Sequence, residues 1–164
     1  IENNVNLIYN IIKGVLIMPI KSFESLIQDY PHEVTILSQA SSFIYTYFDN
    51  ISWAGFYLVE GDSLYLGPFN GKPACTYIPF SKGVCGACAT KHEVVVVNDV
   101  HKFPGHIACD EGANSEIVLP IFVNNSLYAV LDIDSYSFNR FEHDRKLFEE
   151  LALIVSKELN KIKR

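Results

Sequence analysis

The chain has 164 residues, of which 49% are hydrophobic and 20% charged, and its formal net charge is −6. This length suits one domain with a complete hydrophobic core, and the composition is that of an ordinary globular protein. The negative charge argues against a nucleic-acid partner, which needs a basic stripe, and against adhesion to an anionic membrane surface. We therefore expect a globular domain with no nucleic-acid partner and no membrane attachment.

The first residues stand apart from the rest. Residues 5–20 are apolar, but Asn6, Asn10 and Lys13 interrupt them and the stretch is short for a membrane span. It also lacks the basic start and the cleavage site of a signal peptide. Because Met18 is the only methionine, we interpret residues 1–17 as an upstream or artificially added extension, and residues 18–164 as a single domain.

The first half of the domain changes its hydrophobic period near Ile51. Helical spacing of apolar residues predicts two helices between Phe23 and Phe48, separated by Pro31. From Ile51 onward, short runs rich in β-branched and aromatic residues predict strands, and a glycine-rich turn leads into a short helix near residues 83–92. The predicted strands are 51–59, 63–69, 76–80, 93–99, 116–123 and 126–134.

Two further elements complete the predicted order. Residues 98–115 lack periodicity, and a loop of this length inside a compact domain is usually functional. Residues 141–159 predict an amphipathic helix whose first turn carries Glu142 and Asp144, which suits the helix dipole. The order of elements indicates an α+β fold, in which helices pack against one central antiparallel sheet.

Four cysteines are too few to hold a domain of this size together by disulfides, so we expect a reducing, cytoplasmic compartment. They are Cys75, Cys85, Cys88 and Cys109. Each could be a small buried hydrophobe. Cys85 and Cys88, together with His106 and Cys109, also have the spacing of a Cys3His zinc site, but a core this large needs no metal. A thioredoxin-like motif lacks its βαβ context, and we expect no bound metal.

The interpretation that we favour makes Cys109 a nucleophile. It lies in the long loop, where a thiol can be exposed while neighbouring strands hold the residues around it. After attack on an oxidised substrate it would become a sulfenic acid, which condenses with a second thiol. Cys75 and Cys85 are both candidates for that second thiol. His106 is a candidate base, although such a histidine more often tethers a loop.

Three carboxylates are predicted to converge near this thiol. Asp132 and Asp134 are two residues apart on a strand, so both side chains lie on one sheet face and would repel each other without a cation. Tyr128 and Val130 on the same face would argue against a solvent-facing edge. Glu116 lies opposite Asp134 if the intervening hairpin has a three-residue loop or a bulge; a two-residue loop alone would turn Glu116 to the other face.

The first strand adds aromatic side chains to this arrangement. Trp53, Phe56 and Tyr57 follow one another closely in SWAGFY. Together with a thiol and three carboxylates they would form an acidic, partly apolar pocket. Such a pocket is complementary to a small ammonium ligand with an apolar arm. We therefore expect a small cationic sulfoxide as the substrate.

Several segments match a known family together. They are SWAGFYL, LGPFNGKPAC, GVCGACA, NDVHKFPGHIACD, NSEIVLPI and VLDIDS. In this combination the chain resembles the free methionine (R)-sulfoxide reductases, which are single GAF-fold domains. The resemblance runs from Ser22 to Leu159. It implies a GAF-like catalytic domain with the N- and C-terminal helices packed on one face of the sheet and the long active-site loop on the other.

The resemblance also implies the reaction and its partners. Cys109 would attack the sulfur of free methionine sulfoxide, and Cys75 would resolve the sulfenic acid, with Cys85 as an alternative or a relay. Thioredoxin, which receives its electrons from NADPH, would reduce the disulfide. The resemblance implies no bound cofactor. Cys88 has no role in the family pattern. The preference for the R epimer rests wholly on the resemblance.

Substrate contacts are implied in the same way. The acidic substrate residues are Glu116, Asp132 and Asp134, and the pocket aromatics are Trp53 and Tyr57. The sulfoxide oxygen must be protonated as sulfur is attacked, and we assign this role to Glu116. The backbone amides around Ser115 would hold the substrate carboxylate. The alternative function is a GAF sensor that binds a small ligand without chemistry, and GAF domains often form homodimers through a flat helical face.

Overall fold

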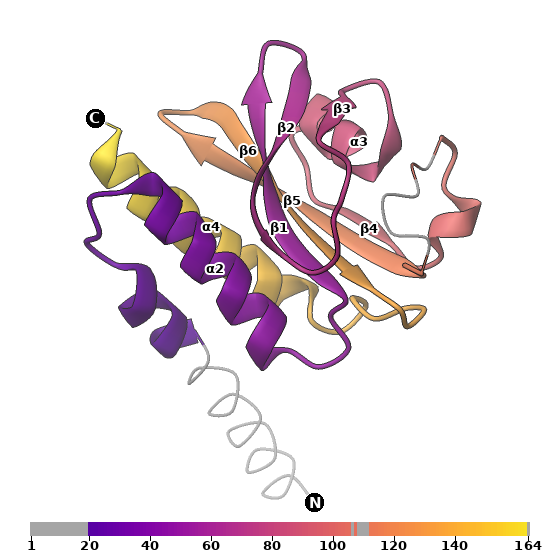
Figure 1. The fold of residues 1–164 in the computed structure, drawn as a ribbon, viewed down its shortest axis with the longest axis horizontal. Coiled ribbons are helices and arrows are strands. Elements are labelled where there is room, and N and C mark those ends of the chain that lie inside the picture. The colour runs from indigo at the N-terminus through magenta and orange to yellow at the C-terminus, as the bar shows by residue number, and fades with distance from the viewer. Residues whose placement is uncertain (1–19, 106, 108–111, 164) are drawn as a thin grey trace, which may run out of the picture.

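The computed structural model describes residues 20–105, 107 and 112–163, and Figure 1 shows their arrangement. The predicted extension at residues 1–17, His106 and Cys109 lie outside the described residues. Six antiparallel strands form one sheet in the order β3-β2-β1-β6-β5-β4. The strands are β1 (Trp53–Glu60), β2 (Ser63–Asn70), β3 (Tyr77–Pro79), β4 (Val95–Val97), β5 (Ser115–Val123) and β6 (Ser126–Ser135). All six predicted strands and the α+β class are confirmed.

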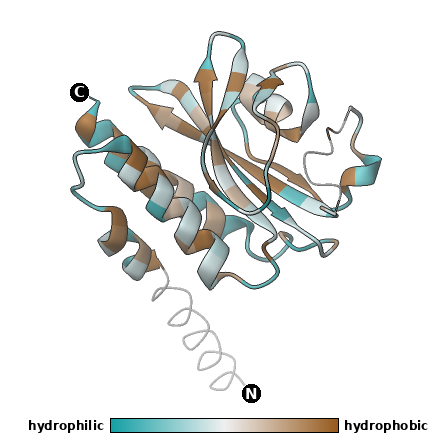
Figure 2. Ribbon diagram, in the orientation of Figure 1, coloured by the Kyte–Doolittle hydropathy of each residue, from teal (hydrophilic) through white to brown (hydrophobic). Residues whose placement is uncertain are grey.

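The long helices cover one face of this sheet. They are α2 (Glu33–Tyr47) and α4 (Arg145–Ile162), which lie side by side in Figure 1. Residues 20–27 are also helical and end before Pro31, as predicted. Hydrophobic and hydrophilic residues alternate along both long helices in Figure 2, as expected where only one side of a helix is buried. The larger hydrophobic core lies between these helices and the sheet.

The opposite face carries a second, smaller core under the short helix α3 (Gly83–Lys91). This helix contacts β3, β4, β5 and β6. Gly86 permits the close approach, because a Cβ atom there would lie 2.6 Å from the carbonyl oxygen of Phe80. The 3-10 turn η1 (Val100–Lys102) follows β4 and begins the long connection to β5.

The β5–β6 hairpin decides which face Glu116 occupies. Its turn has two residues, Asn124 and Asn125, with φ of 50° and 62°. Two positive φ values are typical of a type I′ turn. A register shift then separates Ile121 from Phe122. The predicted three-residue loop is therefore wrong, whereas the alternative of a bulge is confirmed, because this extra residue restores the pairing of Glu116 with Asp134.

The same bulge corrects the prediction for Tyr128. Ile121 pairs with Ala129 and the next pair joins Phe122 to Leu127, so Tyr128 is the residue without a pairing partner across the ladder. Its ring packs against the core under the helices rather than beside Val130, and its hydroxyl donates a hydrogen bond to Glu33. The prediction that Tyr128 shares the face of the aspartates is wrong.

The start of α4 also differs from the prediction. The helix begins at Arg145 rather than at Phe141, because Phe141 is completely buried in the core and the turns around it bring the chain back to the sheet. Glu142 instead accepts a hydrogen bond from Nδ2 of Asn98 at 3.1 Å, and Asp144 pairs with Arg140. Neither acidic side chain caps the helix. Within the described part of the chain, no helix is long and apolar enough to cross a membrane.

Candidate active site

Strand pairing brings the predicted carboxylates to one place. Glu116 pairs with Asp134 across β5 and β6, and Asp134 pairs with Trp53 across β6 and β1. Residues paired across antiparallel strands project from the same sheet face. Asp132, two residues from Asp134, lies on that face as well. The predicted convergence of three carboxylates beside Trp53 is therefore present, on the face that α3 covers.

Helix α3 places a thiol against these carboxylates. Cys85 Sγ lies 4.0 Å from Oε1 of Glu116. One potential ligand atom from each of Cys85, Glu116 and Asp132 lies within 4.8 Å of the others. The exposed fractions of these three residues are 3%, 6% and 7%. The sequence suggested Cys85 as a redox thiol, but its contact with the acidic side chains depends on how α3 packs on the sheet and has no signal in the sequence.

Burial strongly changes the acidity of this cluster. It raises the pKa of Asp132 to about 6, against a lowering effect of hydrogen bonds from Cys85 and Glu116. The pKa of Glu116 is raised well above its ordinary value, first by burial and then by the negative charges of Asp132 and Asp134. The raised pKa favours the protonated form of Glu116, and a hydrogen bond with Asp132 contributes to this shift. A protonated buried carboxyl beside an ionised one is an arrangement that can donate a proton to a ligand.

The described cysteines differ in state. Cys75 is in a disulfide, whereas Cys85 and Cys88 are buried thiols. Burial, followed by the charges of Asp132 and Glu116, raises the pKa of Cys85 well above its ordinary value and that of Cys88 to about 12. Because the thiolate is the nucleophile, neither buried thiol is suited to begin a reaction at neutral pH.

Trp53 forms an aromatic wall beside the carboxylates. Its ring stacks between Tyr57 and Phe69, with centroids 5.9 and 5.3 Å away, and its Nε1 donates to the carbonyl oxygen of Lys72 at 3.1 Å. Gly71 lies against the ring at φ 134°, and a Cβ atom there would be 2.4 Å from Cδ1 of Trp53. Sequence reasoning did not single out this glycine, although a glycine beside aromatic residues is a recognised sign of close backbone approach.

The other predicted aromatics are divided between the two faces. Tyr57 lies in the core under α3, and burial raises the pKa of its phenol, which remains protonated. Phe56 belongs to the core under the long helices. Its assignment to the pocket is wrong, since neighbouring residues of a strand project to opposite faces.

Ser115 links the start of β5 to the segment that follows β6. It is fully buried, and its hydroxyl donates to the carbonyl oxygen of Ser137 at 2.6 Å. The hydroxyl is therefore used internally, and the suggested role of the nearby amides stays a prediction. At the start of the connection to β5, Nε2 of His101 lies 2.9 Å from Oδ1 of Asn114. This contact joins two described residues that precede and follow the sequence segment containing Cys109.

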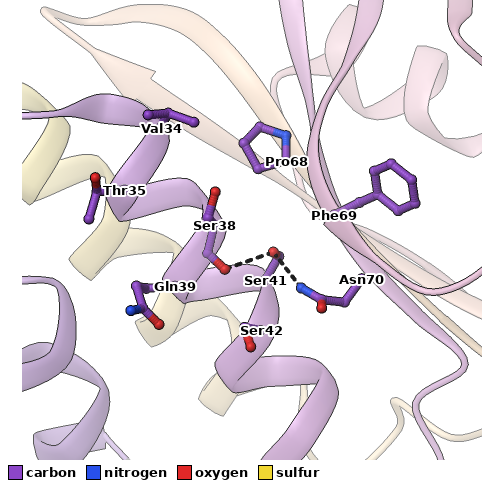
Figure 3. A pocket seen from close by; sticks show the side chains of 9 residues that line it. All are labelled: Val34, Thr35, Ser38, Gln39, Ser41, Ser42, Pro68, Phe69 and Asn70. Atoms are coloured by element: carbon purple, nitrogen blue, oxygen red, sulfur yellow. Dashed lines mark hydrogen bonds between the residues drawn. The ribbon is translucent and has the colours of Figure 1, made fainter.

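A groove on the other side of the sheet is of a different kind. It lies between α2 and β2, has a volume of about 590 Å³ and appears in Figure 3. Ser41 accepts a hydrogen bond from Nδ2 of Asn70 at 3.0 Å and donates to the carbonyl oxygen of Ser38 at 3.1 Å. Its lining has no titratable side chain, so it offers no group for proton transfer. The acidic cluster under α3 is the better candidate for chemistry.

Comparison with known protein families identifies the domain family of this chain. The model of the GAF domain matches residues 31–159, and the fold described above is that of this family. The chain therefore belongs to the GAF-domain family. This agrees with a sheet whose terminal helices lie on one face and whose acidic cluster lies on the other.

Individual relatives identify a more specific family within the GAF-domain proteins. The free methionine-R-sulfoxide reductase of Escherichia coli is 44% identical over 140 residues, which are 85% of each chain. The enzyme of that name from Saccharomyces cerevisiae is 44% identical over 145 residues, 83% of this chain and 81% of the relative. Within the GAF-domain proteins, this chain belongs to the family of free methionine-R-sulfoxide reductases, which are oxidoreductases.

Solved structures agree with this grouping. The reduced form of fRMsr of Staphylococcus aureus has a TM-score of 0.84 at 45% identity and covers 88% of this chain and 94% of its own. The free methionine-R-sulfoxide reductase of Neisseria meningitidis, solved in complex with its substrate, has a TM-score of 0.86 at 38% identity. That match covers 92% of this chain and 91% of its own.

Proposed function

We propose that this chain reduces free L-methionine-(R)-sulfoxide to L-methionine, with Cys109 as the nucleophile. The observation that carries the proposal is the buried contact of Glu116 and Asp132 beside Trp53, in which burial raises the pKa of both carboxyls and so favours the protonated form that can donate to a ligand. Relatives named free methionine-R-sulfoxide reductases supply the identity of the substrate. The buried thiols of Cys85 and Cys88 have raised pKa values, which is unfavourable for a nucleophile. Cys75 is in a disulfide, and Cys109 is the remaining cysteine of the chain.

In the first step the thiolate of Cys109 forms a bond to the sulfoxide sulfur while Glu116 donates its proton to the sulfoxide oxygen. The hydroxyl group formed in this way then transfers to the sulfur of Cys109, while the sulfur–oxygen bond of the substrate and the sulfur–sulfur bond just formed both break. Methionine leaves as a thioether, reduced by two electrons, and Cys109 is oxidised to a sulfenic acid. Without the proton the leaving oxygen would carry a full negative charge, so the proton from Glu116 lowers the barrier.

In the second step the thiol of Cys75 condenses with the sulfenic acid, which forms a disulfide and releases water. The disulfide of Cys75 in this structure supports its role as the resolving thiol. Cys85 is the alternative, but its deep burial and raised pKa make it the slower partner. Thioredoxin then supplies the two electrons that restore both thiols, and we place the reaction in the reducing cytoplasm.

Recognition of the free amino acid follows from charge. Asp132 and Asp134 would hold the substrate ammonium, and the apolar arm of the substrate would lie along Trp53 and Tyr57. A peptide nitrogen carries no charge, so it could not compensate these carboxylates. The amides around Ser115 would take the substrate carboxylate. A methionine sulfoxide inside a peptide should therefore be a poor substrate.

An NADPH-oxidation assay with thioredoxin and thioredoxin reductase tests the proposal. We expect turnover of free L-methionine-(R)-sulfoxide and little turnover of the S epimer or of the N-acetylated sulfoxide. Equal turnover of the N-acetylated substrate would refute the ammonium argument. If the chain binds methionine sulfoxide but oxidises no NADPH with any of the three, it is a ligand-binding GAF module instead.

Variants separate the roles of individual residues. Cys109→Ser should be inactive, Cys75→Ser should complete one turnover and stop, and Cys88→Ser serves as the matched thiol control with unchanged activity. Glu116→Gln should lower kcat by about 10²–10⁴-fold, the usual contribution of a positioned acid. Asp134→Asn should act mainly on KM. An effect of Glu116→Gln on KM alone would remove the acid role from Glu116.

A further inference from the structure

Cys85, Glu116 and Asp132 form a compact set of metal-binding side chains. Their ligand atoms lie within 4.8 Å of one another, and all three residues are more than nine-tenths buried. They come from three different elements, α3, β5 and β6, so the packing of the helix on the sheet holds them in place. One sulfur and two carboxylate oxygens are a donor set that zinc accepts.

A second observation indicates that this set is open to a ligand. Oδ1 of Asp132 is buried and has no hydrogen-bond partner among the described residues. Buried carboxylate oxygens are normally hydrogen-bonded or bound to a cation, because burial of an uncompensated acceptor is costly. The unpartnered oxygen belongs to one of the three residues of the set, and that residue is itself more than nine-tenths buried.

The spacing of the donors suits a small tetrahedral ion. Zinc binds sulfur at about 2.3 Å and oxygen at about 2.0–2.2 Å, so its ligand atoms lie roughly 3.3–3.7 Å apart. The observed separation of 4.0 Å between Cys85 Sγ and Glu116 Oε1 reaches this range by small side-chain rotations. Calcium needs about six to eight oxygens, and magnesium keeps an octahedral oxygen shell. Neither is matched by a set of three donors that includes sulfur.

From this geometry we propose that the reduced protein binds one Zn²⁺ ion through Cys85, Glu116 and Asp132, and that the ion inhibits the enzyme. The thiol of Cys85 releases its proton when it binds the metal. Three protein ligands leave a fourth coordination position for water. The ion occupies the carboxylates that the proposed function assigns to the substrate ammonium and to proton donation. The inhibition therefore rests on the proposed function, whereas metal binding does not.

Metal binding is tested first, without turnover. The complete chain is fully reduced and titrated with Zn²⁺ against a chromophoric chelator. We expect one equivalent to bind, with Cys85→Ser and Asp132→Asn each lowering the affinity, Cys85→Ser by about 100-fold or more. Cys88→Ser is the matched control, since this buried thiol lies one helical turn from Cys85, and its affinity should equal that of the wild type. A Cys85→Ser variant that keeps full affinity, or a Cys88→Ser variant that loses it, would overturn the ligand set.

A spectroscopic readout covers the case in which Cys85→Ser does not fold. In a Cys75→Ser/Cys109→Ser background, Co²⁺ in place of Zn²⁺ should give a thiolate-to-metal charge-transfer band that persists when Cys88 is also changed to serine. Without that band the proposed thiolate ligand is wrong. The band does not depend on catalysis, so a chain that binds cobalt but reduces no sulfoxide would contradict only the proposed function.

Inhibition is measured in the NADPH assay after direct binding is known, with the order of addition chosen so that thioredoxin itself is not exposed to free metal. Zn²⁺ should raise the apparent KM for free methionine sulfoxide and leave kcat unchanged, and a chelator should reverse the effect. Inhibition that lowers kcat alone at saturating substrate would show that the ion and the substrate occupy different places. Zinc binding without any inhibition would likewise refute the shared site.

Discussion

Asp132→Asn isolates the energetic cost of keeping a carboxylate in the buried cluster. Asparagine has nearly the same shape as aspartate but cannot ionise. Asp132 is 7% exposed, and burial raises its pKa from 3.8 to about 6. Between these two pH values the folded protein binds more protons at Asp132 than the unfolded chain does. The free energy of unfolding therefore falls as pH rises through this window and levels off above about 6.

The size of this cost follows from the same two pKa values. A pKa difference of about two corresponds to about 3 kcal/mol, which is absent below the unfolded pKa and complete above the folded pKa. Relative to wild type, Asp132→Asn should thus gain up to about 3 kcal/mol between about pH 4 and about pH 7.5. In a domain of this size the change corresponds to roughly 6–12 °C in Tm. The variant should at the same time lose activity.

Urea unfolding followed by circular dichroism at both pH values measures the difference. Glu150→Gln, on the exposed side of α4, controls for the loss of one negative charge outside the buried cluster. The absolute stability of Asp132→Asn at one pH is not decisive, because the new amide also needs hydrogen-bond partners. If the free-energy difference from wild type is the same at both pH values, the raised pKa of Asp132 is wrong.

Three further predictions concern the surroundings of the site. Gly71→Ala should lower the free energy of unfolding, measured in urea, by about 2 kcal/mol or more and should raise KM, because its Cβ would collide with Trp53. Gly61→Ala is the control, since Gly61 also has a positive φ but has open space around it. Equal losses of stability in the two variants would contradict the collision. Asn125→Ala should destabilise the protein by about 1 kcal/mol, because alanine is unfavourable at the φ of 62° that this position adopts. Asn125→Gly should not destabilise it. An alanine variant as stable as wild type would argue against the type I′ turn. Cys85 and Cys88 should resist iodoacetamide in the folded protein at neutral pH and react after unfolding, as followed by mass spectrometry; rapid labelling of folded Cys85 would contradict its raised pKa.

Much of the fold could be predicted because its signals are local. The change of period near Ile51, the glycine-containing turns and the spacing of Asp132 and Asp134 each depend on a few neighbouring residues. The same period of two would have placed Phe56 correctly, since Trp53 and Tyr57 project to one face and Phe56 to the other. The prediction grouped all the aromatic residues of SWAGFY in one pocket, although neighbouring residues of a strand project to opposite faces.

The remaining features depend on contacts between distant parts of the chain. The register shift between Ile121 and Phe122 comes one residue after Pro120, but a proline alone does not fix the position of a bulge. The shift nevertheless decides both the face of Tyr128 and the pairing of Glu116. The contact of Cys85 with the carboxylates arises from the packing of α3 on the sheet. The late start of α4 arises because Phe141 is more stable in the core than in a helical turn exposed to solvent.

The hydrogen bond from Trp53 to Lys72 has a consequence for how such an enzyme can change its substrate. Lys72 lies in the segment that leads to Cys75, so this hydrogen bond joins the Trp53 ring to the segment that carries the proposed resolving thiol. A substitution that reshapes the wall for a larger side chain would also release this loop. If Cys75 resolves the sulfenic acid as proposed, a variant that accepts a new substrate would be recycled more slowly, and variants selected only for binding would accumulate in the oxidised form.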